Sequence, residues 1–198
     1  MIIWINGAFG SGKTHTAYEL NKRIPNSYVY DPEEIGFFIS DNLPDKMKLN
    51  DFQDYPMWRD FNYKMLTHIN DTYDGVIIVP MTITNEIYFK EIISKMRQNN
   101  LDINHFTLMA KKETLIKRLK KRGDGKNSWP VKQIDRCLDN LTNEIYAEHI
   151  STDNIKIETV AEKIATKCGV KLLPDNRGWL TKKKDRLLVT LRHIRLLK

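Results

Sequence analysis

The stretch MIIWINGAFGSGKTHTAYE, residues 1–19, decides the fold. Its first six residues are an apolar run of strand-forming side chains, and the next eight, GAFGSGKT, fit the pattern G-x-x-x-x-G-K-[ST]. Residues 15–24 predict a helix, because Ala17, Leu20 and Ile24 recur on one side. A strand, a glycine-rich turn and a helix N-terminus in this order favour a phosphate-binding loop over a chance glycine-rich turn.

Each part of this loop has an expected role. Its glycines let successive N–H groups point at a polyphosphate, and the helix dipole attracts the same anion. Lys13 is expected to hold the β- and γ-phosphates of ATP, and the Thr14 hydroxyl to ligate Mg²⁺. The predicted nucleotide-binding residues are Gly7, Ala8, Phe9, Gly10, Ser11, Gly12, Lys13 and Thr14.

Composition narrows the class of protein. A chain of 198 residues with 41% hydrophobic side chains suits one globular domain. Its two cysteines, Cys137 and Cys168, form neither a disulfide framework nor a metal-binding pattern, so we expect reduced thiols in a cytosolic protein. The N-terminus lacks the features of a secretory signal, and no apolar run is long enough to span a membrane.

The net charge of +7 is concentrated at one end of the chain. Residues 177–198 hold eight of the 32 basic residues and only one of the 25 acidic ones, so residues 1–176 are neutral. The positive net charge therefore does not indicate that residues 1–176 bind nucleic acid. We expect residues 1–176 to form the domain and residues 177–198 a separate basic C-terminal helix.

Strands and helices are expected to alternate along the body, which implies β-α-β units and a parallel sheet covered on both faces. The predicted strands cover 1–6, 27–30, 75–80, 103–109 and about 146–152. The predicted helices cover 15–24, 33–50 in part with a break near Pro44, 52–72, 85–98, 112–122, 131–140 and 158–167.

The carboxyl ends of parallel strands are where ligands of such sheets bind. Asp31 ends the second strand, and there it can act as a general base for a substrate hydroxyl or hold Mg²⁺ through water. A helix N-cap is an equally weighted alternative, because Pro32 follows it. The third strand ends in Val79-Pro80 where a Walker-B acid would stand, which weakens a hydrolase or motor interpretation more than a small-kinase one.

Two further places hold candidate substrate contacts. Arg118 and Arg122 are four residues apart on a basic helix, and with the glycine-bearing loop that follows they predict a lid over residues 112–130 that neutralises phosphoryl charge. A solvated basic helix face is the alternative. Arg59 is a candidate for binding the acceptor, whereas its neighbour Trp58 is expected to be core.

The C-terminal segment is basic and amphipathic. Its apolar residues recur at helical spacing with Lys and Arg between them, a pattern typical of helices at anionic membrane surfaces or in a partner groove. Docking on the protein's own body is the alternative, and the concentration of charge favours surface binding slightly. The apolar positions are Leu180, Leu187, Leu188, Leu191, Ile194, Leu196 and Leu197.

Several segments together resemble the bacterial tunicamycin resistance ATP-binding protein family. They are WINGAFGSGKT, SYVYDPE, YPMWRDFN, IIVPMTI, HFTLMA, GKNSW, QIDRC and the basic tail. The resemblance implies a three-layer α/β/α P-loop kinase-like fold with a five-stranded parallel sheet, and protection against the nucleoside antibiotic tunicamycin. It also implies a cytoplasmic protein associated with the inner face of the membrane through its C-terminal helix. Asp31 is similar in position to the catalytic aspartate of small antibiotic phosphotransferases such as the chloramphenicol enzyme.

Three functions follow as hypotheses. The first is an ATP- and Mg²⁺-dependent phosphotransferase in which Asp31 activates a hydroxyl of the antibiotic and Lys13, Arg118 and Arg122 stabilise the transferred group. The second is an ATP-dependent protein that sequesters the drug at the membrane without modifying it. The third is a nucleoside or nucleotide kinase.

Overall fold

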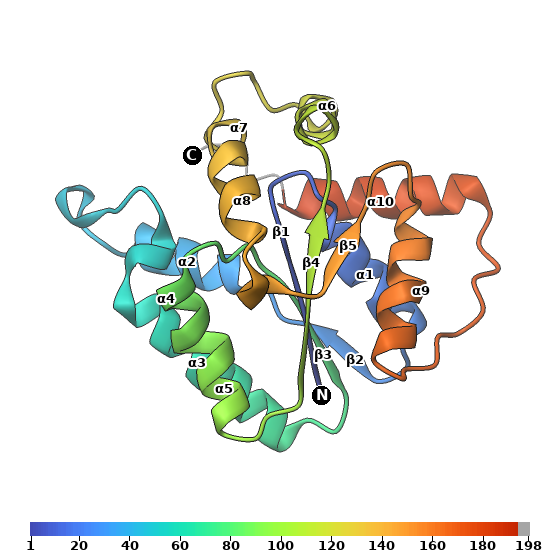
Figure 1. The fold of residues 1–198 in the computed structure, drawn as a ribbon, viewed down its shortest axis with the longest axis horizontal. Coiled ribbons are helices and arrows are strands. Elements are labelled where there is room, and N and C mark those ends of the chain that lie inside the picture. The colour runs from blue at the N-terminus through green and yellow to red at the C-terminus, as the bar shows by residue number, and fades with distance from the viewer. Residues whose placement is uncertain (194–198) are drawn as a thin grey trace.

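The fold is organised around a five-stranded, all-parallel sheet, as the sequence predicted (Figure 1). It is taken from a computed structural model that describes residues 1–193, so Ile194, Leu196 and Leu197 of the predicted amphipathic pattern lie outside the described residues. The strand order is β2-β3-β1-β4-β5. The strands are β1 (Ile2–Gly7), β2 (Ser27–Val29), β3 (Val76–Pro80), β4 (Ile103–Met109) and β5 (His149–Ser151).

Helices connect and follow these strands. They are α1 (Lys13–Arg23), α2 (Pro32–Asp41), α3 (Pro56–Thr72), α4 (Glu86–Phe89), α5 (Lys95–Gln98), α6 (Lys112–Arg122), α7 (Trp129–Lys132), α8 (Ile134–Leu141), α9 (Ile157–Lys167) and α10 (Trp179–His193). A π-helical turn, Lys90–Ser94, joins α4 to α5, so the predicted helix over 85–98 is continuous. Short 3₁₀ turns occupy Asp45–Met47, Phe52–Asp54 and Glu144–Tyr146.

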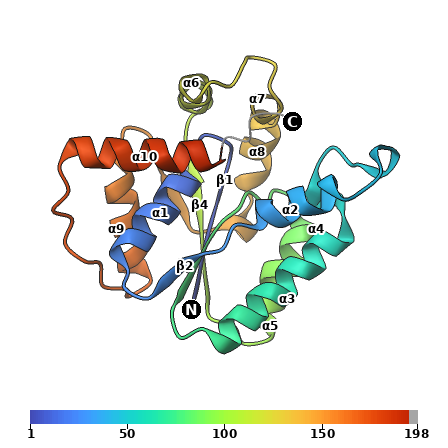
Figure 2. The same cartoon turned by 180° about the vertical axis from the view of Figure 1, so that it is seen from behind.

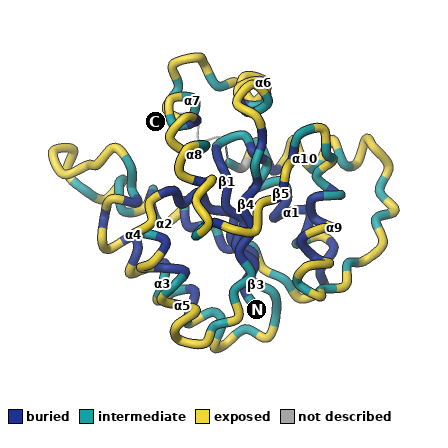
Figure 3. Tube along the Cα trace, in the orientation of Figure 1, coloured by how far each residue is buried: buried dark blue, intermediate teal, exposed yellow. Residues whose placement is uncertain are grey.

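The sheet has a hydrophobic core on each face, which gives the predicted three layers. Because side chains alternate along a strand, Trp4 of β1 packs on one face, in the core that includes Trp58 of α3. Ile3 and Ile5 point to the other face, in the core with α1 and α9. All six residues of β1 are buried, and Figure 3 shows the buried trace running through the centre of the molecule.

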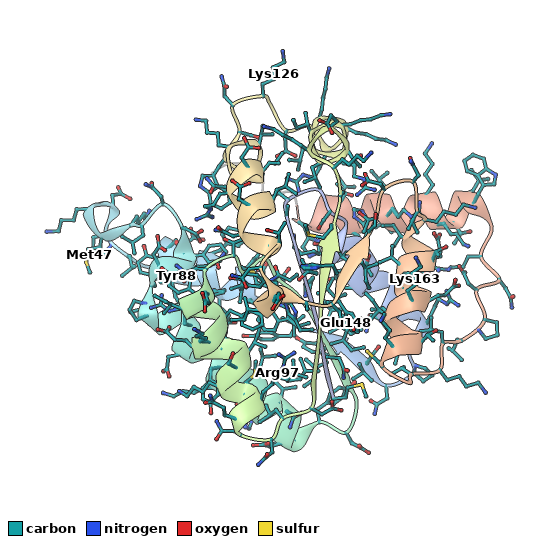
Figure 4. The ribbon with its side chains drawn as sticks, viewed as in Figure 1. Met47, Tyr88, Arg97, Lys126, Glu148 and Lys163 are labelled. Carbon is teal, nitrogen blue, oxygen red and sulfur yellow. The ribbon has the colours of Figure 1, made fainter. Side chains whose placement is uncertain are left out.

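The structure corrects several predicted boundaries. The helix expected over 52–72 begins at Pro56, because Phe52–Asp54 forms a 3₁₀ turn and proline is favoured at the first helical position. The helix expected in part over 33–50 ends at Asp41, and residues 42–55 form a loop with two 3₁₀ turns that projects from the body, with Met47 near its tip (Figure 4). Pro44 fixes an extended backbone there (φ −55°, ψ 143°), which ends the helical pattern. The strand expected over 146–152 is confined to His149–Ser151, because Glu144–Tyr146 forms a 3₁₀ turn.

All five strands end at one edge of the sheet. The phosphate-loop motif follows β1, Asp31 follows β2, and Thr152 follows β5. Helices α6, α7 and α8 lie beyond this edge, and α10 crosses α1 beside it, as seen from both sides (Figures 1 and 2). The fold thus gathers the predicted site residues of the loop and of the second strand at one end of the molecule.

Candidate functional site

The loop between β1 and α1 has the backbone that its glycines predict. Gly7, Gly10 and Gly12 have φ values of 141°, 82° and 100°, conformations that L side chains rarely adopt. A Cβ at Gly7 would lie 2.6 Å from the carbonyl oxygen of Leu108, so the loop is also tightly packed against β4. Gly12 caps α1 without a side-chain hydrogen bond, so no side chain competes with an anion for that end of the helix.

Lys13 is buried within this loop. Its ammonium donates to the carbonyl oxygen of Ala8 at 3.2 Å and lies 5.5 Å from the centre of the Phe9 ring. Burial lowers its pKa to about 8, against the attraction of carboxylates that include Glu33 and Asp31. A buried cation with so few partners has free donors to offer an anion.

Asp31 lies at the carboxyl end of β2 and caps α2. Its Oδ1 accepts a hydrogen bond of 3.0 Å from the backbone N–H of Glu33, so the N-cap interpretation is confirmed. Its Oδ2 lies 3.3 Å from Nε2 of His193, at the end of α10. The capping geometry fixes the direction of the carboxylate; its role as a base remains a prediction.

Glu33 is a second carboxylate at this site, and it is not among the residues predicted from the sequence. Burial raises its pKa, and the negative charge of Asp31 adds to that rise, whereas Lys13, His193 and Arg122 oppose it. Its signal in the sequence is its position two residues after Asp31, on the first turn of a helix that starts at the ligand-binding edge. Two carboxylates and three cations therefore influence one another across the loop.

The two predicted lid arginines have different surroundings. Arg118 donates from Nη1 to the carbonyl oxygens of Gly10 (3.3 Å) and Ser11 (3.4 Å) in the loop, and from Nη2 to the carbonyl oxygen of Thr152 (2.7 Å). Arg122 is paired through Nε with Asp124 at 2.6 Å. Arg118 thus braces the phosphate loop from outside, while Arg122 is the one whose charge acts on Lys13 and Glu33.

The lid segment lies against the phosphate loop at one more point. The Phe9 ring packs edge-on against Trp129 of α7, with 5.2 Å between ring centres. Lys126, in the loop between α6 and α7, points away from the body (Figure 4). This contact with Phe9 places residues 125–129, GKNSW, over the loop that is predicted to bind nucleotide.

Arg59 and Trp58, on α3, are both buried. Trp58 is fully buried and donates to the carbonyl oxygen of Pro32 at 2.9 Å, which confirms its core assignment. Arg59 donates to the carbonyl oxygen of Gln53 at 2.6 Å, pairs with Glu91 and stacks 4.2 Å from the Tyr88 ring. These contacts hold Arg59 beside Gln53, Tyr88 and Glu91. The structure does not bring it together with Lys13 and Asp31.

The end of β3 carries no acid, as its sequence indicated. After Pro80, the Met81 N–H donates to Ile5 of β1, and the Thr82 hydroxyl donates to the carbonyl oxygen of Gly7 at 2.9 Å. The segment that would hold a Walker-B carboxylate here supports the start of the phosphate loop instead.

The basic C-terminal helix docks on the body, which was the alternative expectation. Its inner face carries Lys182, Arg186, Val189 and His193, at helical spacing; Val189 is buried, and Arg186 pairs with Glu158. His15, just after the phosphate loop, contacts the Thr190 hydroxyl at 3.2 Å. The opposite side of α10 exposes Leu180, Leu187 and Leu191, and Trp179 and Leu188 of this helix are exposed as well.

The residues present fit a magnesium nucleotide. Oxygen is the ligand atom that Mg²⁺ prefers, and Mg²⁺ in kinases is bound largely by phosphates and water with few protein ligands. Thr14 supplies a hydroxyl on the first turn of α1, and the buried Ser11 hydroxyl of the loop has no hydrogen-bond partner among the described residues. Among the described residues, no group of three or more His, Cys, Asp or Glu side chains forms a metal site by itself.

Comparison with protein families places most of the chain in one of them. Residues 3–146 match the family model described as an AAA domain. No curated protein sequence matches the chain. None of the described helices has the length and apolar character that crossing a bilayer requires.

Comparison with solved structures finds one protein similar in sequence and fold and others that share the fold alone. The tunicamycin resistance protein of Deinococcus radiodurans is 34% identical, with a TM-score of 0.76 over 88% of this chain and 98% of that one. A sugar kinase from Janibacter sp. HTCC2649 is 15% identical, with a TM-score of 0.59 over 85% and 94%. The APS kinase of Mycobacterium tuberculosis, in complex with AMPPNP and APS, is 15% identical, with a TM-score of 0.56 over 85% and 96%. The last two share the fold.

Proposed function

The chain belongs to the AAA-domain family and to the family of the Deinococcus radiodurans tunicamycin resistance protein, and on this premise we propose that it is an ATP-dependent phosphotransferase acting on a nucleoside antibiotic such as tunicamycin. The observation that carries the proposal is the placement of Asp31 at the same sheet edge as the phosphate loop, close enough to influence the pKa of Lys13. The proposal and the two alternative functions all start from a nucleotide-binding, P-loop kinase-like fold.

Each side chain has a part in this proposal. The loop residues 7–14 hold the ATP phosphates, Lys13 and Arg122 balance their negative charge, and Asp31 accepts the proton of the acceptor hydroxyl. Arg118 holds the loop in shape through the carbonyl oxygens of Gly10 and Ser11. Thr14 would hold Mg²⁺, which supplies positive charge at the β- and γ-phosphates when it is bound.

The direct test is transfer of label. The protein is incubated with Mg²⁺, γ-³²P-ATP and tunicamycin, and the drug is isolated and counted. We expect label on the drug with the natural chain and about a thousandfold less with Asp31→Asn, because an amide cannot take up the hydroxyl proton. Asparagine can still accept the N–H of Glu33 as an N-cap, so the variant should fold normally.

The same variant separates transfer from sequestration. A transferase with Asp31→Asn loses resistance in cells while it keeps affinity for the drug. A protein that only sequesters tunicamycin keeps both, and neither form labels the drug. We favour transfer over sequestration because Asp31 is held in a defined orientation beside a phosphate-binding loop.

A nucleoside or nucleotide kinase is the remaining rival. It would label a common nucleoside or nucleotide in the absence of the antibiotic, so a panel of these acceptors belongs in the same assay. Label on a panel member with a higher kcat/KM than on tunicamycin would replace the antibiotic as the substrate.

We further propose that α10 brings the protein to the inner face of the cell membrane. The support is its exposed side, where Leu180, Leu187 and Leu191 are 58–64% exposed and lie beside Lys183 and Lys184. Leu187→Glu/Leu191→Glu should abolish sedimentation with anionic phosphatidylglycerol vesicles. Phe38→Glu, a change at a 67% exposed apolar residue on α2, is the matched control and should sediment like the natural chain.

A further inference from the structure

His193 is held between two hydrogen-bond acceptors. Its Nδ1 lies 2.8 Å from the carbonyl oxygen of Val189, and its Nε2 lies 3.3 Å from the carboxylate oxygen Oδ2 of Asp31. The Nδ1–H donates to the carbonyl oxygen, and Nε2 forms an ion pair with the carboxylate when the ring is protonated. The Asp31 carboxylate raises the pKa of the ring, which favours that protonated form.

This contact leaves Asp31 little room for another partner. Its Oδ1 already accepts the N–H of Glu33, and its Oδ2 faces His193. Only 12% of the Asp31 side chain is exposed. Nε2 of His193 lies 3.3 Å from Oδ2, where the O–H of an acceptor would need to approach in order to give up its proton.

The helix that carries His193 is fastened unevenly. Its first half, with the residues just before it, forms a network of ion pairs with the body: Arg177 with Glu19, Lys22 with Asp185, Lys182 with Asp175, and Arg186 with Glu158. From Val189 to His193, the described contacts with the body are of several kinds. They include buried Val189, the Thr190 hydroxyl on His15, and His193 between Asp31 and the edge of the Tyr18 ring.

We propose that the last turns of α10 are an autoinhibitory strap, in which His193 blocks Asp31 and must leave before an acceptor hydroxyl can reach it. The inference rests on the proposed function of Asp31 as the base. The strap is released at its His193 end, and the ion pairs around Arg177 keep the first half of the helix in place. In the resting protein, then, nucleotide binds freely while the acceptor side stays closed.

Chemical modification of Asp31 tests the block without any turnover. The full chain is treated with a water-soluble carbodiimide and glycine ethyl ester, and label on Asp31 is quantified by peptide mass spectrometry. His193→Ala should raise the labelling rate about tenfold, since the ion pair that covers Oδ2 is lost. His193→Gln, which keeps a neutral donor, should give an intermediate rate. Trp179→Ala, at an exposed position at the start of α10, should label like the natural chain.

Transfer kinetics with the same variants test the inhibition. His193→Ala should raise kcat/KM for tunicamycin about tenfold, with the Kd for ATP unchanged. An unchanged rate of Asp31 labelling in both His193 variants would overturn the strap. Faster labelling with equal or slower transfer would overturn the inhibition and make His193 a positioning residue.

The two proposals fail in different ways. If neither the natural chain nor His193→Ala labels the drug, phosphotransfer to tunicamycin is wrong, and the strap is decided by the labelling of Asp31 alone. If both chains label the drug equally and Asp31 labelling is unchanged, transfer stands and the strap is wrong.

Discussion

The Arg118 guanidinium donates a hydrogen bond of 2.7 Å to the carbonyl oxygen of Thr152, and this bond ties α6 to the loop that follows β5. The same side chain reaches the carbonyl oxygens of Gly10 and Ser11. Three segments that meet at the ligand-binding edge are thus joined by one planar fork, which a lysine cannot reproduce.

Arg118→Lys should therefore weaken ATP binding about tenfold and lower the free energy of unfolding by about 1–2 kcal/mol, as expected for the loss of two or three hydrogen bonds. Titration calorimetry and urea denaturation measure the two effects. The neighbouring Lys117→Ala, at an exposed position, is the control and should change neither. An unchanged Kd in Arg118→Lys would mean that the loop keeps its shape without this brace.

Lys13→Met should make the protein more stable and unable to bind ATP. Lys13 is 8% exposed, and the burial of its ammonium in the absence of phosphate costs free energy that a methionine of similar length avoids. We expect a gain of about 1 kcal/mol in the free energy of unfolding. Thermal denaturation with and without ATP and Mg²⁺ checks both halves: ATP should raise the Tm of the natural chain and leave that of the variant unchanged. A less stable variant would contradict this.

Gly36→Ala should destabilise the α2 region that carries Asp31. A Cβ at Gly36 would lie 2.3–2.6 Å from ring atoms of Phe52, so the ring or the helix must shift. Overpacking of this kind costs about 1–3 kcal/mol. Gly125→Ala, where an added Cβ has no neighbour within 4 Å, is the matched control and should be close to neutral. Equal Tm values for the two variants would show that Phe52 moves aside at no cost.

Stability should fall in mild acid because of His105. Its Nδ1 donates to the carbonyl oxygen of Ala147 and its Nε2 faces the Asn6 amide, and burial lowers its pKa from 6.5 to about 4. Above pH 6.5 the ring is neutral in both states, so its contribution is fully present. Between pH 6.5 and 4 the unfolded chain binds a proton that the folded protein does not, so up to about 3 kcal/mol is lost.

His105→Gln tests this origin of acid sensitivity. A glutamine can donate to Ala147 and accept from Asn6 without binding a proton in this range. Urea denaturation at a series of pH values should show a shallower fall in stability between pH 6.5 and 4 for this variant. The exposed His68→Gln is the control and should keep the natural slope. The same slope in both variants would assign the acid sensitivity to other groups.

Local patterns predicted the parts of the site that depend on local forces. The phosphate loop follows from its glycines, whose positive φ angles no other residue adopts easily, and the α2 N-cap follows from Asp31 before Pro32. The buried strands β1 and β3 follow from continuous apolar runs. The family resemblance and the all-parallel sheet were confirmed with them.

Contacts between distant parts of the chain were beyond such patterns. His193 and Asp31 stand near opposite ends of the sequence, and only the docking of α10 brings them together. The partners of Arg59 lie before and after it on other elements, so its burial with Glu91 and Tyr88 had no local sign. Residues on the outer face and on the inner face of α10 both recur at helical spacing, so the spacing does not indicate which face docks on the body. Ion pairs with α1 and α9 decide it.

Met1 and His193 lie at opposite edges of the sheet, and this has a practical consequence for handling the protein. Met1 precedes β1 at the amino edge, whereas His193 reaches the carboxyl edge beside Asp31 (Figure 1). A purification tag fused after Lys198 begins only a few residues from that histidine, and a tag placed before Met1 begins at the far edge. Activity and vesicle binding are therefore best compared on protein tagged at the N-terminus, with the C-terminal residues left in their natural form.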